Sequence, residues 1–314
     1  MKSKNILDAI GMIDDELILD AKTNTKKIKH RFILCVAVIT TFLLMTTALA
    51  VNLGWHTKLL NYLKPSEKQL ETLNKATNLS EVTVSNNGVT VTVKQTLADK
   101  FGVYVLYEIT APENFEFNDN IRWTLNALNL PYKQDDYVVF GTYDYTILEQ
   151  DKNKRLELLY YENTAPIESG KMTLYLRDLC EYGSDGTRVT HNTLIEGEWQ
   201  LEWNFTYKDT GKNIETNIQM GNSTIKGVYI SPMSLCVYLT GNISENMLPV
   251  IKFKDGSEIK YNEQNENLSF INYLKDEENK IYINKVSWRL ENIIDLNNVD
   301  YIQIDDIIIP INNI

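Results

Sequence analysis

The stretch that decides the fold is WQLEWNFTY, residues 199–207. Apolar and polar side chains alternate along it, which is the two-residue period of a β-strand with one buried face and one solvated face. Its apolar face consists of Trp199, Leu201, Trp203, Phe205 and Tyr207. Because half-buried strands of this kind are typical of antiparallel sheets packed in pairs, the stretch predicts a β-sandwich around it.

The same period recurs on both sides of this strand. Asn87-Gly88 and Asp255-Gly256 are dipeptides of tight hairpin turns, and alternating apolar residues flank both. Strands are expected at 82–84, 89–93, 103–109, 156–161, 172–176, 228–230, 235–239, 250–253, 259–261, 281–286, 301–304 and 307–311. We therefore predict a mainly β protein with two tandem β-sandwich domains of immunoglobulin-like class, 81–217 and 218–314, joined near residues 214–224.

A long apolar run, FILCVAVITTFLLMTTALAVNL, occupies residues 32–53 and contains no charge in 22 positions. As a helix it is about 33 Å long, which matches the roughly 30 Å hydrocarbon core of a bilayer. A buried core helix would show a polar face, and this run has none. Basic residues gather just before it, at 22–31, so the positive-inside rule predicts a cytoplasmic arm at 1–31 and an extracellular remainder.

A cleaved signal peptide is the main alternative to this membrane span. Ala48-Leu49-Ala50 has the small-x-small pattern of a cleavage site. However, signal peptides begin with a short basic region, whereas the 31 residues before this run include five acids. Cleavage near Val51 would remove the arm and leave a secreted module.

Charge and cysteine content restrict the compartment and the partners. The chain has a net charge of −11, and because residues 1–53 are net positive by two, residues 54–314 carry −13. Such a surface repels nucleic acid, so we expect no direct nucleic-acid partner. Only Cys180 and Cys236 lie beyond the apolar run, in different predicted domains. A large exported region without a disulfide framework is typical of a Gram-positive cell surface.

The arm carries the most informative short pattern. Residues 5–21 read NILDAIGMIDDELILDA, in which four apolar residues recur at spacings of four, three and four, with three consecutive acids between the last two. This spacing predicts one apolar helical face, which so short an arm cannot bury on itself. The acids disfavour an anionic membrane surface, so a cytoplasmic protein partner is favoured over a membrane-lying helix or a disordered tail. The predicted partner-binding residues are Ile6, Ile10, Ile13, Asp14, Asp15, Glu16 and Leu17.

Residues 54–80 are expected to form a helical stalk next to the membrane. Trp55 suits the outer membrane interface, and Pro65 would end a first amphipathic helix. Ser66-Glu67-Lys68-Gln69 then has the pattern of a capping box that begins a second helix.

No catalytic or metal-binding motif is found. The three histidines share no ligand spacing with each other or with a cysteine, and His191 is expected in a loop. Acid pairs such as Asp135-Asp136 and Asp305-Asp306 are interpreted as turn residues rather than as calcium ligands or a glycosidase pair. We therefore predict no enzyme activity and no cofactor.

Aromatic residues on the predicted strands admit two interpretations. The tyrosines in question are Tyr104, Tyr107, Tyr160 and Tyr161. They would suit a groove for carbohydrate or peptide, but aromatic residues at a two-residue period are more often part of a sheet core. We favour the core.

Several features together resemble a known family. They are the opening arm run, the basic flank, the apolar span, Pro65-Ser66-Glu67-Lys68-Gln69, and the runs Leu97-Ala98-Asp99-Lys100 and Tyr104-Val105-Leu106-Tyr107. The chain resembles Gram-positive anti-sigma-factor-like single-pass membrane proteins with an uncharacterised two-part β-rich ectodomain. The resemblance implies that the arm holds a sigma factor through its apolar stripe, that its acids face basic patches of that partner, and that the ectodomain senses an unknown extracellular ligand.

Three functions follow as hypotheses. The first is a membrane-anchored, anti-sigma-like regulator in the cell membrane, with its arm on a sigma factor or other cytoplasmic protein and residues 32–53 in the bilayer. The second is a cell-surface binding or adhesion module without a signalling role. The third, a surface hydrolase with an unrecognised carboxylate site, is the least favoured.

Overall fold

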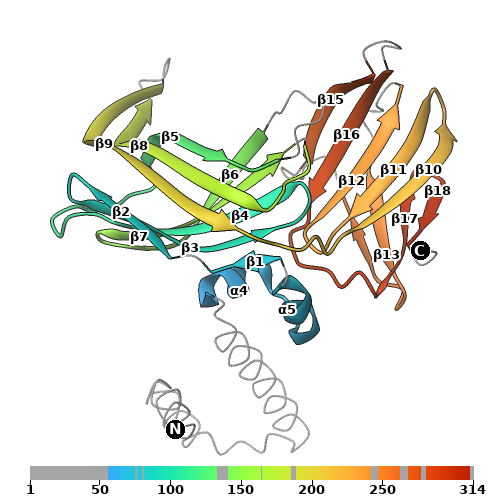
Figure 1. The fold of residues 1–314 in the computed structure, drawn as a ribbon, viewed down its shortest axis with the longest axis horizontal. Helices are drawn as coiled ribbons and strands as arrows, with labels where there is room; N and C mark the ends of the chain where they lie inside the picture. The colour runs from blue at the N-terminus through green and yellow to red at the C-terminus, as the bar shows by residue number, and fades with distance from the viewer. Residues whose placement is uncertain are drawn as a thin grey trace, which may run out of the picture. The chain divides into compact units, whose positions relative to one another are not determined.

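The computed structural model describes residues 56–74, 76–79, 81–132, 141–163, 165–184, 189–241, 247–261, 268–276 and 281–311. These residues lie in one compact unit (Figure 1). The predicted arm and the predicted membrane span lie outside the described residues. Within the described part of the chain, no helix has both the length and the apolar character that a membrane crossing requires.

The largest sheet begins with the predicted hairpin. Strands β2 (Val82–Asn86) and β3 (Val89–Ala98) pair antiparallel around Asn87 and Gly88, whose φ values are 45° and 80°. Both turn residues are therefore left-handed, as a two-residue hairpin turn requires. The sheet order is β1-β3-β4-β7-β6, with β2 paired to β3. The other strands are β1 (Thr77–Asn78), β4 (Gly102–Thr110), β6 (Gly141–Asp151) and β7 (Lys154–Asn163).

A second, three-stranded sheet faces the first and contains the WQLEWNFTY stretch. Its order is β5-β8-β9, with β5 at Ile121–Asn129, β8 at Gly170–Ser184 and β9 at Val189–Phe205. As predicted, Trp199, Leu201 and Trp203 are buried while the residues between them are exposed. They share one hydrophobic core with Val91 and Val105 of the first sheet.

Residues 212–311 form two further antiparallel sheets. One has the order β10-β11-β12-β16-β15 and the other β14-β13-β17-β18. Buried side chains from both, such as Val237 and Ile302, form a second core. The strands of the first of these sheets are β10 (Lys212–Met220), β11 (Ser223–Ile230), β12 (Ser234–Thr240), β16 (Ile281–Arg289) and β15 (Leu268–Asp276). Those of the second are β13 (Pro249–Phe253), β14 (Glu258–Lys260), β17 (Val299–Ile304) and β18 (Ile307–Pro310).

The expectation of a mainly β protein with several antiparallel sheets is confirmed. The region expected as a join, 214–224, instead lies in the β10–β11 hairpin, so position 218 falls inside β10. The register of that hairpin shifts between Glu215 and Ile218. This irregularity interrupts the two-residue alternation that would otherwise have marked β10 in the sequence.

Two short helices, α4 (Thr57–Leu63) and α5 (Glu67–Leu73), precede the strands. The predicted capping box is present, because the Ser66 N–H donates to Gln69 Oε1 at 2.5 Å and the Gln69 N–H donates to Ser66 Oγ at 3.4 Å. The helices are packed on the body, since Leu63 and Leu70 are buried in one cluster with Leu106 of β4. The first sheet is thus covered on both faces, which explains why β4 is buried without alternation from Gly102 to Tyr107.

Buried polar contacts connect the strands before residue 210 with those after it. Asp99 Oδ2 accepts hydrogen bonds from the hydroxyls of Ser231 and Ser234, each at 2.5 Å. Lys285 Nζ lies 3.4 Å from Glu162 Oε1. These groups are almost fully buried, so the two sets of sheets share a polar seam within one unit.

Candidate functional site

A cleft of about 650 Å³ lies beside the outer strands of the first two sheets. Strand β5 ends the order of one sheet and β6 ends the order of the other. Both contribute to the cleft, together with Glu157 of β7 and residues of β8. Its volume falls in the range of about 300–1,000 Å³ that is usual for small-molecule sites.

Aromatic side chains dominate the cleft. Trp123 comes from β5, Tyr143 and Tyr145 from β6, and Tyr182 from β8. Tyr143 is 58% exposed, whereas Trp123 is only 7% exposed and packs against Trp199 with ring centroids 5.1 Å apart. The cleft therefore has an aromatic wall that extends from the sheet core to solvent.

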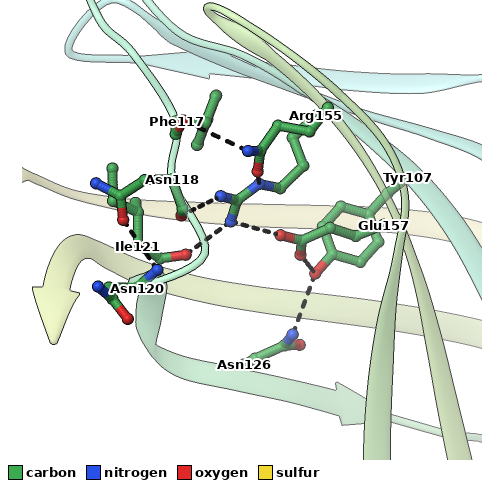
Figure 2. A network of polar contacts seen from close by, with 9 residues as sticks. Tyr107, Phe117, Asn118, Asn120, Ile121, Asn126, Arg155 and Glu157 are labelled. Carbon is green, nitrogen blue, oxygen red and sulfur yellow. Dashed lines mark hydrogen bonds and ion pairs between the residues drawn. The ribbon is translucent and has the colours of Figure 1, made fainter.

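A buried arginine holds the first residues of β5 in place (Figure 2). Arg155 Nη1 donates to the Ile121 carbonyl and Nη2 to the Asn118 carbonyl, both at 2.7 Å. Its Nε donates to Gln150 Oε1 at 2.9 Å, and its guanidinium lies 4.5 Å from the centroid of the Phe117 ring. The charge is thus surrounded by acceptors, and the strand that carries Trp123 is fixed by them.

A chain of hydrogen bonds leads from this arginine toward the cleft (Figure 2). Arg155 Nη1 lies 3.4 Å from Glu157 Oε1, and the Tyr107 hydroxyl donates to Glu157 Oε2. The Tyr107 oxygen in turn accepts from Asn126 Nδ2 at 3.1 Å. Because the Tyr107 proton is committed to the carboxylate, the amide of Asn126 has a defined orientation with Nδ2 toward Tyr107.

Burial governs the ionisation of the two acids in this chain. Removal of Glu157 from water raises the pKa of its carboxyl, against the lowering effects of the Tyr107 hydroxyl and of Arg155. The pKa of the Tyr107 phenol is raised well above its ordinary value by burial and then by the adjacent Glu157 carboxylate. Both Glu157 oxygens are occupied inside the protein, so the group supports the cleft and is not placed for proton transfer to a ligand.

Two polar atoms at the cleft lack a hydrogen-bond partner within the described residues. They are Oδ1 of Asn126 and Nε1 of Trp123, and both are buried. An unsatisfied buried polar atom costs about 1–3 kcal/mol, so a ligand or water that pairs with it would recover part of that cost. At the mouth, the guanidinium of Arg122 lies 5.8 Å from the centroid of the Tyr145 ring.

The residues singled out from the sequence lie elsewhere. The predicted partner-binding residues Ile6, Ile10, Ile13, Asp14, Asp15, Glu16 and Leu17 lie outside the described residues, as does the pair Asp135-Asp136. Tyr104, Tyr107 and Tyr160 are buried, which confirms them as core residues. Asp305-Asp306 forms the β17–β18 turn, as predicted. Among the described residues, no group of three or more His, Cys, Asp or Glu side chains is arranged to hold a metal ion.

The cleft itself was missed in the sequence, although its tyrosines carry a signal. Tyr143, Tyr145 and Ile147 alternate along β6, which is the same two-residue period that identified the other strands. His191, expected in a loop, lies on β9, where its ring is 5.7 Å from that of Tyr182. The reason is that β8 and β9 continue as a long exposed ribbon whose polar residues resemble a loop sequence.

Comparison with known proteins gives two matches. Residues 21–111 match a family described as "Domain of unknown function (DUF4179)". The crystal structure of a conserved domain protein from Bacillus anthracis is similar, with a TM-score of 0.48 and 13% sequence identity over 72% of this chain and 75% of that chain. Among curated proteins, no match is found.

Proposed function

We propose that this protein is a membrane-anchored regulator, anti-sigma-factor-like in type. Its arm, residues 1–31, binds a sigma factor or another cytoplasmic protein, residues 32–53 cross the membrane, and the β-rich remainder receives a signal outside the cell. The observation that carries this proposal is the arm itself. Ile6, Ile10, Ile13 and Leu17 form a stripe that the arm cannot bury alone, directly before a basic flank and an uncharged span.

The family match covers the predicted span together with the first part of the β body. The matched residues, 21–111, run from the basic flank through the span and both described helices to β4. For the body we propose two β-sandwiches in tandem, based on its two cores, each formed by two sheets. The immunoglobulin-like class of these sandwiches stays a prediction.

The test is capture of the cytoplasmic partner by the full-length chain. We expect a cytoplasmic protein that co-purifies with the wild type to be lost from an Ile10→Asp, Leu17→Asp variant, because two charges in the stripe prevent its burial in the partner. The matched control is Met12→Asp, Leu19→Asp, since it introduces the same two charges off the stripe. Mass spectrometry of the captured proteins identifies a sigma factor if one is bound.

Two results would lead us to abandon the regulator. One is a wild-type arm that captures nothing the double variant loses. The other is a mature protein that starts near Val51, because cleavage there removes the arm. Gel mobility and N-terminal sequencing of the cell-associated protein distinguish the cleaved from the intact form.

The cleft favours the second candidate function, a surface binding module. A small-molecule cleft with an aromatic wall is useful to a binding protein whether or not the arm has a partner. The two functions are separated by deletion of the arm, because a binding module keeps its whole activity without residues 1–31 and a regulator loses its cytoplasmic partner.

A further inference from the structure

We propose that the cleft between β5 and β6 binds an uncharged saccharide, with the sugar ring stacked on Tyr143 and Tyr182. The inference deepens the proposed function and rests on it in one respect, since it names the chemical class of the signal that the β body receives. It is carried by the lining of the cleft, and its test does not involve the arm.

Charge disfavours a cation near Arg122 and, at long range, an anion. Residues 54–314 carry a net charge of −13, which disfavours an anion at long range. Of the two charged side chains that line the cleft, Glu157 is paired with Arg155, while the Arg122 guanidinium already lies over the Tyr145 ring and would repel a cation there. An uncharged ligand meets neither obstacle.

The aromatic wall favours a ligand that has both an apolar face and a polar edge. Tyr143 is 58% exposed although it is a large aromatic residue, and it projects from an outer strand next to the cleft. A pyranose ring presents axial C–H groups to an aromatic face and hydroxyls around its rim. Amphipathic rings such as tyrosine combine the matching contacts, an apolar face and a hydroxyl.

Polar groups for the rim of the sugar are present beside this wall. Asn120, Thr124 and Ser184 line the cleft with an amide and two hydroxyls. Deeper, the Glu157–Tyr107–Asn126 chain fixes the Asn126 amide so that Oδ1 remains an acceptor with no partner among the described residues. A hydroxyl donor on the ligand, or a water held by it, satisfies this atom.

Direct binding to the full-length protein tests the inference. The probes are the uncharged disaccharides cellobiose and N,N′-diacetylchitobiose, titrated calorimetrically in a detergent without a sugar headgroup. We expect saturable one-to-one binding of at least one of them. Tyr143→Ala is expected to weaken that affinity about 3- to 10-fold, and Tyr143→Phe to change it less than about 2-fold, because the ring carries the contact.

The control is Tyr132→Ala, which removes a tyrosine that is 38% exposed and does not line the cleft. It should leave the affinity unchanged. The inference is overturned if neither disaccharide binds saturably, if Tyr143→Ala and Tyr182→Ala bind as tightly as the wild type, or if only an acidic sugar or a short peptide binds. None of these results affects capture by the arm, so a failure here is distinct from a failure of the regulator.

Discussion

At the scale of single residues, Arg155 is the side chain on which the cleft depends most. Its relative exposure is 1%, and it donates to Gln150 and to two carbonyls next to β5 while it faces the Glu157 carboxylate. A buried ion pair contributes little net stability compared with apolar residues of the same shape. Removal of one partner is much more costly, because the other charge stays buried without compensation.

Arg155→Met is therefore expected to lower the free energy of unfolding by about 3–5 kcal/mol, measured by urea denaturation near pH 7. The matched control is Arg122→Met, which removes an exposed arginine from β5 and should change stability by no more than about 0.5 kcal/mol. Equal effects of the two substitutions would show that the buried network does not hold β5.

The cost of Arg155→Met should also depend on pH. Burial raises the Glu157 pKa above its usual 4.5, and Arg155 opposes that rise. Without Arg155 the folded-state pKa rises further, so the variant keeps a proton on Glu157 over a pH range in which the wild type has released it. The difference in stability therefore grows as pH rises through the wild type's folded-state Glu157 pKa, which lies above 4.5, and levels off above the variant's still higher pKa. A difference independent of pH would contradict the ionised pair.

At the scale of elements, helix α4 begins at a titratable cap. The N–H of Lys58 donates to Nδ1 of His56 at 3.3 Å, a bond that requires this nitrogen to be unprotonated. The pKa of His56 is lowered, first by burial and then by the positive charge of Lys94, while Glu108 and Glu149 oppose the shift. The neutral form is thus the one that the folded protein stabilises.

The stability contributed by this cap is fully present above pH 6.5 and is lost as pH falls through the lowered folded-state pKa. Between pH 7.5 and pH 5 we expect the protection factors of the α4 amides, which correct for the slower intrinsic exchange at the lower pH, to fall by the equivalent of about 1 kcal/mol, the usual value of an N-cap. His56→Asn supplies a cap that does not titrate, so its α4 should keep the same protection at both pH values. If α4 lost the same amide protection at pH 5 in the wild type and in His56→Asn, protonation of His56 would be excluded as the cause.

Sequence patterns predicted elements correctly where the local chemistry of a turn, a helix cap or an alternating strand determines the structure. The Asn87-Gly88 and Asp255-Gly256 hairpins, the capping box at Ser66 and the alternation at 199–205 each follow from local chemistry, and each is present. Strands β5, β6, β10 and β15 were missed. In β5 the alternation includes Leu125, which is 39% exposed, and in β10 a register shift interrupts it. For β5 and β10, pairing with neighbouring strands rather than the local pattern decides that the segments are strands, whereas β6 does carry the alternation of Tyr143, Tyr145 and Ile147.

The cleft was beyond prediction for a different reason. Trp123 and Tyr182 are far apart in the sequence, and they meet only because β5 pairs with β8 in an antiparallel register that places Ile121 opposite Glu181. Residue spacing within one segment does not indicate which distant strand that segment will pair with. The arm differs from the cleft, because its apolar spacing lies within one short segment and is visible in the sequence. Its predicted partner, however, is another molecule.

At the scale of the whole molecule, the polar seam makes the two sets of sheets interdependent. Lys285 is fully buried and its Nζ contacts the first set in three ways. It donates to the Asn163 carbonyl at 3.0 Å, lies 3.4 Å from Glu162 Oε1, and sits 3.9 Å from the centroid of the Phe101 ring. All three partners precede residue 210, whereas Lys285 lies on β16.

Helices α4 and α5 also form hydrogen bonds with a residue that follows β16. Gln69 Nε2 donates to the Ile293 carbonyl at 2.9 Å, and the Ile293 N–H donates to the Leu63 carbonyl at 3.4 Å. Helices α4 and α5 therefore contact the connection between β16 and β17 as well as β4. If residues 32–53 span the membrane, these helices are the segment through which a change in the body would be transmitted to the arm.

Lys285→Met should therefore uncouple the two sets of sheets as well as destabilise the protein. We expect the wild type to unfold in one urea transition, because the seam links both cores. In the variant, β12 and β16 should lose amide protection at a lower urea concentration than β4 and β7, with a cost of about 3–5 kcal/mol because the buried Glu162 loses its cationic partner. Hydrogen exchange with peptide-level mass spectrometry resolves the two sets.

The matched control for this experiment is Lys226→Met, because Lys226 is an exposed lysine on β11 that bonds only to Asn217 among the contacts described for its Nζ. It should leave the single transition intact. If Lys285→Met lowered protection equally in both sets, the seam would contribute stability without separating two cooperative units. If β12 and β16 instead lose protection first, the two sets are separate cooperative units that the seam joins, each with its own hydrophobic core.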